Sequence, residues 1–420
     1  MNKTVFSWCL YDWGNSAFAT IVMAAVLPVF FSNYVAGNLE GSLASSYWGY
    51  TNTLAMLLIA LFAPFLGSVA DVRAKKKILL GAFTLLGVIS TLMLSFSTAD
   101  AVIYVLLFYA MGRIGFAGGN IFYDSLLPHV ASPENQDKVS TWGYAAGYLG
   151  GGLVLALNLL WIMNPESWGF ANTGSAVKFS FVFVGFWWLL FTIPLLMNVK
   201  EPKALDGQGN ERTLFVVAWR RAFLTFKELK ANREAFKFLI AFFLYNDGIG
   251  TIMVMAAIFG AEINIPESDL IGAILLVQFV GVPATYLFGW LSGKISTKHA
   301  IIVALTGYLF ISIGGYFIVT PLHFWILALA VGLVQGGAQA LSRSFFSNMI
   351  PKEKSAEYFS FYDIFSKFSG ILGPLTFAVV AEMTNSSRLG IVSLVVFFIA
   401  GIWILATVRT QKTILKPNQV

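Results

Sequence analysis

The chain has 420 residues, of which 57% are hydrophobic and only 11% are charged, and its mean hydropathy is +0.75. A soluble globular protein carries about 25% charged residues, so this composition excludes a water-soluble globule and indicates an integral membrane protein. The formal net charge of +6 is explained by basic loops on the cytoplasmic side of a membrane, so nucleic-acid binding is not needed to account for it.

Twelve apolar stretches are long enough to cross a bilayer as helices, which takes about 20 residues each. They cover residues 7–33, 48–70, 78–97, 101–123, 142–162, 178–197, 236–260, 270–290, 300–318, 322–346, 360–382 and 388–408. We therefore expect an all-α membrane protein in which twelve transmembrane helices form two pseudo-symmetric six-helix bundles. The expected parts are an N-terminal bundle (1–197), a cytoplasmic linker (198–235) and a C-terminal bundle (236–420).

The first and seventh stretches share a sequence pattern, which indicates an internal duplication. Thr20-Ile-Val-Met-Ala-Ala25 follows a cluster with Tyr11, Asp12, Gly14 and Asn15, and Thr251-Ile-Met-Val-Met-Ala-Ala257 follows Tyr245, Asn246, Asp247 and Gly248. A duplicated six-helix unit is typical of secondary transporters, whose halves rock about a shared site near the membrane midplane.

The orientation follows from the basic residues, because basic loops stay in the cytoplasm. Most of the 27 Lys and Arg residues fall on one side of the expected membrane, so both termini are expected to be cytoplasmic. The first stretch is too long for a signal peptide and contains Asp12 and Asn15, so we interpret it as a retained helix. The single cysteine, Cys9, excludes an internal disulfide.

The loop between the second and third stretches carries a spaced motif, Gly67-Ser-Val-Ala-Asp71-Val-Arg73-Ala-Lys75-Lys-Lys77. Gly67 permits a close helix approach, and Asp71 is expected to cap the next helix or to pair with a base. The motif resembles the loop signature of the major facilitator superfamily, although Val72 and Ala74 depart from it. We assign a gating role to Gly67, Asp71, Arg73 and Lys75, and to Asp124. Asp124 could meet Arg73 or could be a solvated acid at the end of its helix.

Arg113 lies near the middle of the fourth stretch, followed by Gly115, Gly118 and Gly119, and resembles the superfamily's fourth-helix Arg/Gly motif. An ionisable residue there costs at least about 2.5 kcal/mol on insertion scales, so Arg113 needs a carboxylate. Asp12, Asp247 or the solute could supply it, and two interpretations stay open: a central solute cavity or a fixed structural ion pair. A desolvated Asp12 or Asp247 could also carry a coupling proton.

Further polar residues in the cavity-forming stretches could contact a polar solute or hydrogen-bond neighbouring helices. The candidates for solute binding or coupling are Asp12, Asn15, Arg113, Asn120, Tyr148, Asn246, Asp247, Gln278, Gln335, Gln339 and Tyr362. Asp363 and Lys367 are four residues apart on one helix face, which favours a structural pair. Gly143, Gly147 and Gly151 leave one face of the fifth stretch bare, for static packing or for a sliding seam between the halves.

The linker is expected to hold an interfacial helix with Phe215, Trp219, Ala222, Phe226 and Leu229 on one face. His129, His299 and His323 lack companions at metal-ligand spacing, and we find no nucleotide-binding or catalytic motif. We therefore expect no metal, no cofactor and no enzymatic activity.

Several stretches in both halves resemble the vacuolar-effluxer-like branch of the major facilitator superfamily. They are Tyr11-Asp-Trp-Gly-Asn-Ser-Ala-Phe18, Phe122-Tyr-Asp-Ser-Leu-Leu-Pro128, Gly143-Tyr-Ala-Ala-Gly-Tyr-Leu-Gly-Gly-Gly152, Gln339-Ala-Leu-Ser-Arg-Ser344 and Phe359-Ser-Phe-Tyr-Asp363. The resemblance implies the major facilitator fold and, for fungal relatives, amino-acid export. The short terminus and connectors resemble bacterial members, which implies a multi-pass protein of the cell inner membrane.

We therefore expect a monomeric secondary transporter that moves a small, polar, amino-acid-like solute by alternating access, with protons as a candidate coupling ion and membrane lipid around it. One alternative is a lipid-like or amphipathic substrate, which would be favoured if the aromatic residues of 179–191 line the cavity. From a different class, the chain could be a non-transporting membrane sensor. Fold does not determine what is carried.

Overall fold

The computed structural model describes residues 2–39, 43–204, 214–263 and 265–409, and all regular elements in these ranges are helices. Twelve helical segments within them are long and apolar enough to cross a membrane. This confirms the predicted number of spans and the all-α fold class. The first span runs over Lys3–Val35 and the last over Ser387–Thr407.

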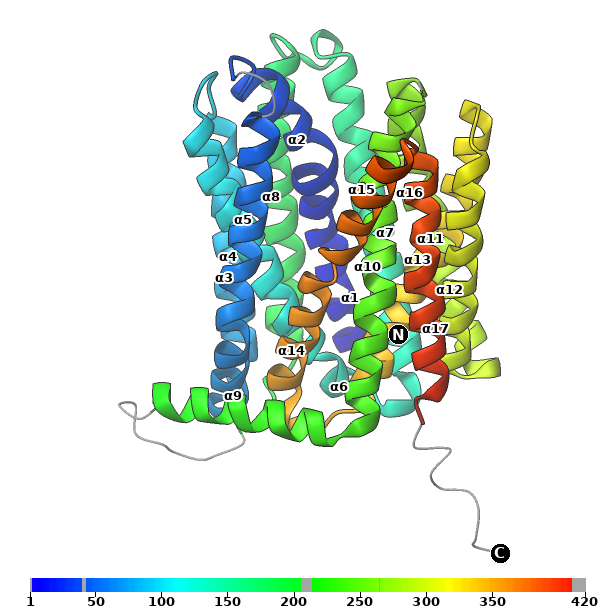
Figure 1. Cartoon of the computed structure of the whole chain (residues 1–420). Helices are drawn as coiled ribbons and strands as arrows, with labels where there is room; N and C mark the ends of the chain where they lie inside the picture. The colour runs from blue at the N-terminus through cyan, green and yellow to red at the C-terminus, as the bar shows by residue number, and fades with distance from the viewer. Residues whose placement is uncertain (1, 40–42, 205–213, 264, 410–420) are drawn as a thin grey trace, which may run out of the picture. The chain divides into compact units, whose positions relative to one another are not determined.

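The helices of the first half follow the expected spans (Figure 1). They are α1 (Lys3–Ala17), the π-helical η1 (Phe18–Ala25), α2 (Val26–Phe30), the π-helical η2 (Phe31–Val35), α3 (Leu43–Arg73), α4 (Lys76–Met93), α5 (Val102–Ser125), α6 (Leu127–Val130), α7 (Gln136–Met163) and α8 (Thr173–Asn198). Within them α4 packs against α5 and α8, and α1 packs against α8. Figure 1 shows α3, α4, α5 and α8 running alongside one another.

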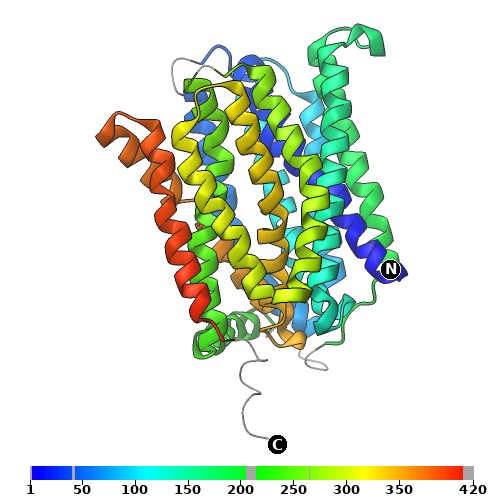
Figure 2. The ribbon, with the colours of Figure 1, turned by 90° about the vertical axis from the view of Figure 1, so that its right-hand side faces the viewer.

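The second half repeats this pattern of long helices. They are α9 (Leu214–Ala231), α10 (Arg233–Glu262), α11 (Glu267–Ile295), α12 (Thr297–Gly314), α13 (Pro321–Ser347), α14 (Ser355–Phe368), α15 (Leu372–Thr384), α16 (Ser387–Ser393) and α17 (Val395–Thr407). Helix α13 packs against α11 and α12, which lie side by side with it in Figure 2. Helix α10 packs against α17.

The chain divides into two compact units that largely follow the two halves of the sequence. Unit 1 comprises Met1–Asn135, Trp142–Trp219 and Glu353–Ser360, and unit 2 comprises Gln136–Thr141, Arg220–Lys352 and Phe361–Val420. Each unit therefore contains a short segment from the opposite half of the sequence. We call Glu353–Ser360 the α14 segment and Gln136–Thr141 the α7 segment.

The ends of the helices follow local sequence chemistry. The Asn2 side chain accepts a hydrogen bond from the Val5 N–H group at the start of α1, and Asn172 and Ser175 form a reciprocal capping box at the start of α8. Such caps satisfy backbone N–H groups that have no partner inside the helix.

One span is broken in its middle, between α14 and α15. Gly370 and Pro374 are spaced so that Pro374 stands where a continuous helix would need an N–H donor for the Gly370 carbonyl oxygen. The helix ends at Phe368 and resumes at Leu372. The sequence therefore explains the position of this break.

The linker contains the predicted amphipathic helix, α9. Ala222 and Leu229 are buried on its apolar face. The Trp219 ring stacks on Phe65 within unit 1, and Phe226 packs against Phe361 within unit 2. The side chain of Phe215 lies outside the described residues.

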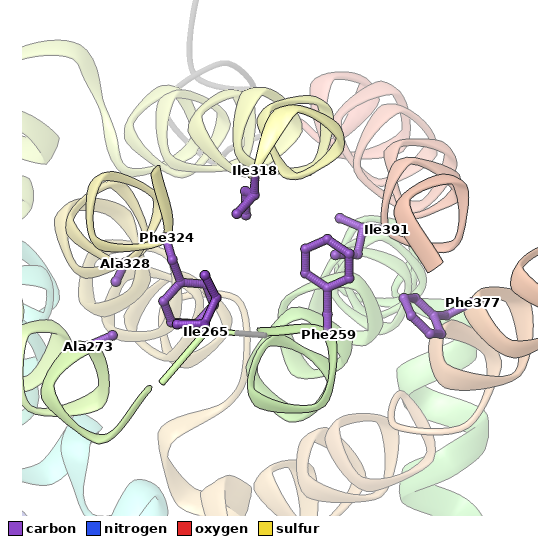
Figure 3. Packing of buried hydrophobic residues seen from close by; sticks show 8 residues of the cluster. All are labelled: Phe259, Ile265, Ala273, Ile318, Phe324, Ala328, Phe377 and Ile391. Atoms are coloured by element: carbon purple, nitrogen blue, oxygen red, sulfur yellow. The ribbon is translucent and has the colours of Figure 1, made fainter. Parts of the chain in front are cut away.

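A buried apolar cluster closes one end of unit 2. Figure 3 shows the side chains of Phe259 from α10, Ile391 from α16 and Ile318 from the segment after α12 pointing toward one another. A small apolar cavity lies among residues of this cluster, lined by Phe259, Ile318 and Phe324 and by other aliphatic side chains. Its lining has no charged residue, so we assign it to packing.

Candidate functional site

The gating motif forms a buried ion pair in unit 1. The Asp71 carboxylate lies 2.8 Å from Lys76 Nζ, and the two side chains are 0% and 2% exposed. This confirms that Asp71 pairs with a base. Arg73 and Lys75 were the predicted basic residues of the gate, but Lys75 is solvent-exposed and its neighbour Lys76 is the buried partner. A five-residue separation across the turn after α3 carries Lys76 back toward Asp71.

The α14 segment is bound to this pair. Asp71 Oδ2 accepts a hydrogen bond of 2.8 Å from the Glu357 N–H group in the first turn of α14. Asp71 therefore caps α14, and not the next helix in sequence, as a negative group at a helix N-terminus should. Ser68 Oγ donates to Glu357 Oε1 at 3.1 Å. A Cβ atom on Gly67 would lie 2.5 Å from the Ala356 carbonyl oxygen, so Gly67 permits the predicted close approach.

Ser355 connects the α14 segment to two further helices of unit 1. Its hydroxyl donates to the Ser125 carbonyl oxygen at 2.8 Å and accepts from Lys76 Nζ at 2.7 Å. His129 Nε2 lies 3.2 Å from both Lys76 Nζ and Ser355 Oγ. Lys76, His129, Ser355 and Glu357 were not among the predicted gating residues. No local signal could have identified Ser355 and Glu357, since they lie almost 290 residues from Asp71 in the sequence.

A second acid holds the start of α4. The two carboxylate oxygens of Glu201 accept hydrogen bonds from the N–H groups of Lys76 and Lys77, at 2.8 and 2.9 Å. Partial burial raises the pKa of Glu201 above its ordinary value, although these hydrogen bonds act in the opposite direction. Arg73 and Asp124 both lie in unit 1, and their pairing remains a prediction.

The α7 segment is bound in unit 2 by different chemistry. Asp137 accepts hydrogen bonds from Ser344 Oγ at 2.6 Å and from Thr297 Oγ1 at 2.5 Å. The buried Arg343 guanidinium donates to the Ser140 hydroxyl and carbonyl oxygens, at 2.9 and 3.0 Å. Asp137 and Arg343 were not among the predicted site residues, because their partners lie in the other half of the chain.

Asp12 lies in a polar and aromatic cluster at one end of the first span. The Tyr123 hydroxyl donates to Asp12 Oδ2 at 2.7 Å, and the Tyr123 ring stacks between Trp8 and Tyr11. Asn15 Nδ2 donates to Asn120 Oδ1 at 2.8 Å. Three of the predicted site residues, Asp12, Asn15 and Asn120, therefore lie in one region of unit 1. Tyr148, another predicted site residue of unit 1, is buried on α7.

Arg113 does not form the ion pair that one interpretation required within unit 1. Its Nη1 atom lies 3.2 Å from Met23 Sδ, and its buried Nε atom has no hydrogen-bond partner among the described residues. The reason is distance along α5, because Tyr123, which binds Asp12, lies about 15 Å beyond Arg113 at 1.5 Å per residue. A pair with Asp247 stays untested, since Asp247 belongs to unit 2.

Gln335 repeats this arrangement in unit 2. Its Nε2 atom lies 3.3 Å from Met253 Sδ, and its Oε1 atom is buried without a partner among the described residues. Arg113 and Gln335 thus occupy matching helices, and each contacts a methionine of its unit's duplicated first helix. The duplication recognised in the sequence is therefore visible as a repeated side-chain contact.

Asp247 is fully buried in α10 and faces the break between α14 and α15. Its Oδ1 atom accepts a hydrogen bond of 2.9 Å from the Gly373 N–H group. The adjacent Asn246 donates to Ser369 Oγ at 2.6 Å. The Tyr362 ring stacks on Phe242 and Phe346.

The remaining predicted residues have simple positions. Gln278 is half-buried on α11, and Gln339 lies on α13. Lys367 Nζ lies 3.4 Å from Asp363 Oδ1, which confirms the predicted structural pair.

The bare face of the fifth span packs on α1 within unit 1. A Cβ atom on Gly150 would lie 2.3 Å from the Trp13 carbonyl oxygen, and one on Gly147 would lie 2.6 Å from Ser16 Oγ. These distances support the static-packing interpretation of this face. The face therefore packs against α1.

The sequence matches a known family over nearly its whole length. Residues 36–416 match the family described as "Vacuole effluxer Atg22 like". The chain is 36% identical over 407 residues to the Bacillus subtilis protein named "Uncharacterized MFS-type transporter YxiO", which covers 96% of this chain and 94% of that protein. It is 26% identical over 404 residues to "Autophagy-related protein 22" of Saccharomyces cerevisiae strain S288c, covering 82% of this chain and 74% of that protein.

Solved structures with low sequence identity share the fold. The human organic anion transporter MFSD10 aligns with a TM-score of 0.72 at 14% identity, covering 96% of this chain and 99% of that one. The proton:xylose symporter XylE also aligns with a TM-score of 0.72 at 14% identity, covering 96% and 94%. These similarities confirm the major facilitator fold.

Proposed function

Because this chain belongs to the family of Atg22-like vacuole effluxers and is an MFS-type membrane transporter, we propose that its solute is small, polar and amino-acid-like. The solute bears a carboxylate and moves by alternating access. The family description, which names effluxers, favours export.

The observation that carries this proposal is that the Arg113 guanidinium has an unsatisfied hydrogen-bond donor among the described residues. A guanidinium group has five N–H donors in a planar fork that matches a carboxylate. Arg113 lies within a membrane span, its Nε has no partner among the described residues, and its Nη1 contacts only a weak sulfur acceptor. An ionisable residue at such a position usually faces a functional partner. A solute carboxylate would satisfy these donors.

Unit 2 also carries polar groups that could bind a solute. Gln335 has a buried oxygen without a partner among the described residues, and Asp247 is a buried acid. An amide oxygen and a carboxylate suit an amine, and Asp247 is the candidate for a coupled proton. A buried polar group needs a hydrogen-bond partner, and a solute amine or a proton would supply one for Gln335 and Asp247.

The α14 segment and the α7 segment provide the gate in this proposal. Alternating access requires each bundle to release what it binds on one side of the membrane. The Asp71–Lys76 pair binds the α14 segment, and Arg343 and Ser344 bind the α7 segment. Release of both segments would open the cytoplasmic side.

The lipid-like alternative receives less support from the aromatic side chains. Phe181 and Trp188 are fully buried, and Trp188 packs on Phe18 within unit 1. Trp187 and Phe191 contact Trp13. These rings pack the first and sixth spans together, so we assign them to helix packing and not to a substrate cavity.

The protein is a multi-pass membrane protein, and its orientation belongs to this proposal. The basic residues of the linker and of the motif after α3 favour a cytoplasmic location for that side and for both termini. The bacterial relative supports the inner membrane.

A parallel ligand screen tests the proposed function. Thermal unfolding of the purified wild type and of Arg113→Ala is measured with amino acids, their amides and uncharged amphiphiles. We expect a free amino acid to stabilise the wild type by several degrees and to leave Arg113→Ala unchanged, with no effect from the amide that lacks the carboxylate. Equal stabilisation of both proteins by amphiphiles would overturn the proposal.

A matched variant separates binding from folding. Gln335→Ala removes the corresponding polar group of unit 2 but keeps the guanidinium. It should weaken the response to the amino acid without changing the preference for the acid over the amide.

A further inference from the structure

The break in the eleventh span leaves backbone acceptors without donors. In a continuous helix the N–H groups of Leu372 and Gly373 would bond the carbonyl oxygens of Phe368 and Ser369. The Gly373 N–H group donates to Asp247 Oδ1 instead, at 2.9 Å. Pro374 has no N–H group for the Gly370 carbonyl oxygen. Among the described residues, no backbone N–H group donates to the carbonyl oxygens of residues 368–370.

The side chains beside these carbonyl groups are acceptors too. Asp247 Oδ2 is buried and has no hydrogen-bond partner among the described residues. Asn246 uses its amide N–H to bind Ser369 Oγ, which leaves the Asn246 oxygen as an acceptor near the break. The Ser369 hydroxyl donates to the Ser366 carbonyl oxygen. The break therefore gathers oxygen acceptors around one buried carboxylate.

The nearest basic residue on this span is directed elsewhere. Lys367 pairs with Asp363, one turn back along α14, in keeping with the tilt of helical side chains toward the N-terminus. A proton on Asp247 would supply one donor, which satisfies at most one of the freed carbonyl oxygens. Several hard oxygen atoms and one negative charge suit a small cation that binds many oxygen ligands at once.

We propose that a monovalent metal cation, sodium, binds at the break between α14 and α15. Its ligands are Asp247 Oδ2 and carbonyl oxygens of residues 368–370, with Asn246 as a further candidate. Unwound backbone carbonyls and half-helix ends supply cation sites in transporters built from broken helices. This inference places sodium at Asp247 in place of the coupled proton considered above, and it does not depend on which solute is carried.

The corresponding helices of unit 1 lack this arrangement. Helix α7 runs unbroken from Gln136 to Met163, so its middle carbonyl groups keep their helical donors. Asp12 receives a side-chain hydroxyl donor from Tyr123. The geometry assigns the cation to unit 2 alone.

The test is a sodium titration of the full-length protein in detergent, with choline chloride holding ionic strength and pH constant. Thermal unfolding is followed by tryptophan fluorescence. We expect a saturable rise of several degrees in the wild type, because a ligand that binds only the folded state stabilises it. Asp247→Asn keeps an oxygen acceptor for the Gly373 N–H group and removes the charge. It should raise the half-saturating sodium concentration at least about tenfold.

Two controls make the result specific. Asp269→Asn is the same change in unit 2, at a carboxylate bound by Trp325 Nε1, and it should keep the full sodium response. Pro374→Ala restores an N–H donor for the Gly370 carbonyl oxygen and should reduce the response even though Asp247 is intact.

Three outcomes would overturn the sodium site. They are no saturable sodium effect, the same effect in Asp247→Asn as in the wild type, or stabilisation by protons or methylammonium but not by sodium. Arg113→Ala separates this result from the proposed function, since it should lose the amino-acid response and keep the sodium response.

Discussion

The two units stabilise the acid of their duplicated first helix in opposite ways. In unit 1, the helix that carries Asp12 becomes π-helical over Phe18–Ala25, its partner α7 is continuous, and a tyrosine hydroxyl binds the acid. In unit 2, the helix that carries Asp247 is regular, and its partner is broken so that the Gly373 N–H group binds the acid. A buried acid needs donors, and either a side chain or an opened helix can supply them.

The two units also use different side chains to bind the α14 segment and the α7 segment. Unit 1 binds the α14 segment through a buried carboxylate and ammonium, whereas unit 2 binds the α7 segment through hydroxyl groups and a guanidinium. One architectural role is thus filled by a buried ion pair in unit 1. In unit 2 it is filled by hydroxyl hydrogen bonds to Asp137 and by the hydrogen bonds of Arg343 to Ser140. Substitutions should therefore have unequal effects in the two units.

The largest expected effect comes from breaking the ion pair of unit 1. Lys76→Met leaves the Asp71 carboxylate buried and unpaired, which should destabilise the protein by about 3 to 5 kcal/mol. Unfolding is followed by reaction of a fluorogenic thiol reagent with Cys9, the single and buried cysteine. The double variant Asp71→Asn/Lys76→Met should recover part of this loss. A loss no larger than that of Ser344→Ala in unit 2 would show that the two units do not differ as described.

An intermediate effect is expected from the packing of the two partner helices. Gly150→Ala places a methyl group 2.3 Å from the Trp13 carbonyl oxygen and should cost about 1 to 3 kcal/mol through overpacking. Gly370→Ala meets no atom closer than 3.7 Å, so it should be close to neutral. The melting temperatures of the two variants, compared with the wild type, measure this difference. Equal losses of melting temperature in Gly150→Ala and Gly370→Ala would contradict the conclusion that α7 is tightly packed and that the break after α14 is open.

The smallest effect concerns the start of the third and ninth spans. Glu201 binds the first N–H groups of α4, whereas the start of α12 has no side-chain cap. Burial raises the pKa of Glu201 above its ordinary value of 4.5, so the folded state binds the proton more tightly than the unfolded state. Stability should therefore fall as pH rises above about 4.5 until the folded-state pKa is passed.

Glu201→Gln should remove this part of the pH dependence. Because Glu201 is half-buried, the difference should stay below about 1 kcal/mol. Melting curves of the two proteins between acid and neutral pH test the sign. A wild type that becomes more stable than Glu201→Gln as the pH rises would contradict it.

Much of the fold could be predicted from the sequence, because its causes are local. A span requires a run of apolar residues, and the runs in this chain identified all twelve spans. Gly370 and Pro374 are readable in the same way, although the break they cause was not predicted. Asp363 and Lys367 paired as their four-residue spacing indicates.

The candidate site was only partly predictable. Asp71 was correctly expected to pair with a base, but the choice of Lys76 over Lys75 depends on which side of a turn is buried. Glu357, Asp137 and Arg343 gave no local signal, since each acts through contacts with a distant part of the chain. Arg113 was correctly recognised as unusual, and its contact with Met23 could not be anticipated.

The sequence by itself determined the membrane class, the spans, the internal duplication and the positions of the rare charged residues, because each depends on composition or on short spacing. Only the tertiary structure decided which partner each charge has. In a membrane interior every polar group must find its partner within the protein, and the partner is set by which helices pack together. For Asp71 and Asp247 that partner is the backbone of a helix more than 120 residues away, which no local pattern encodes.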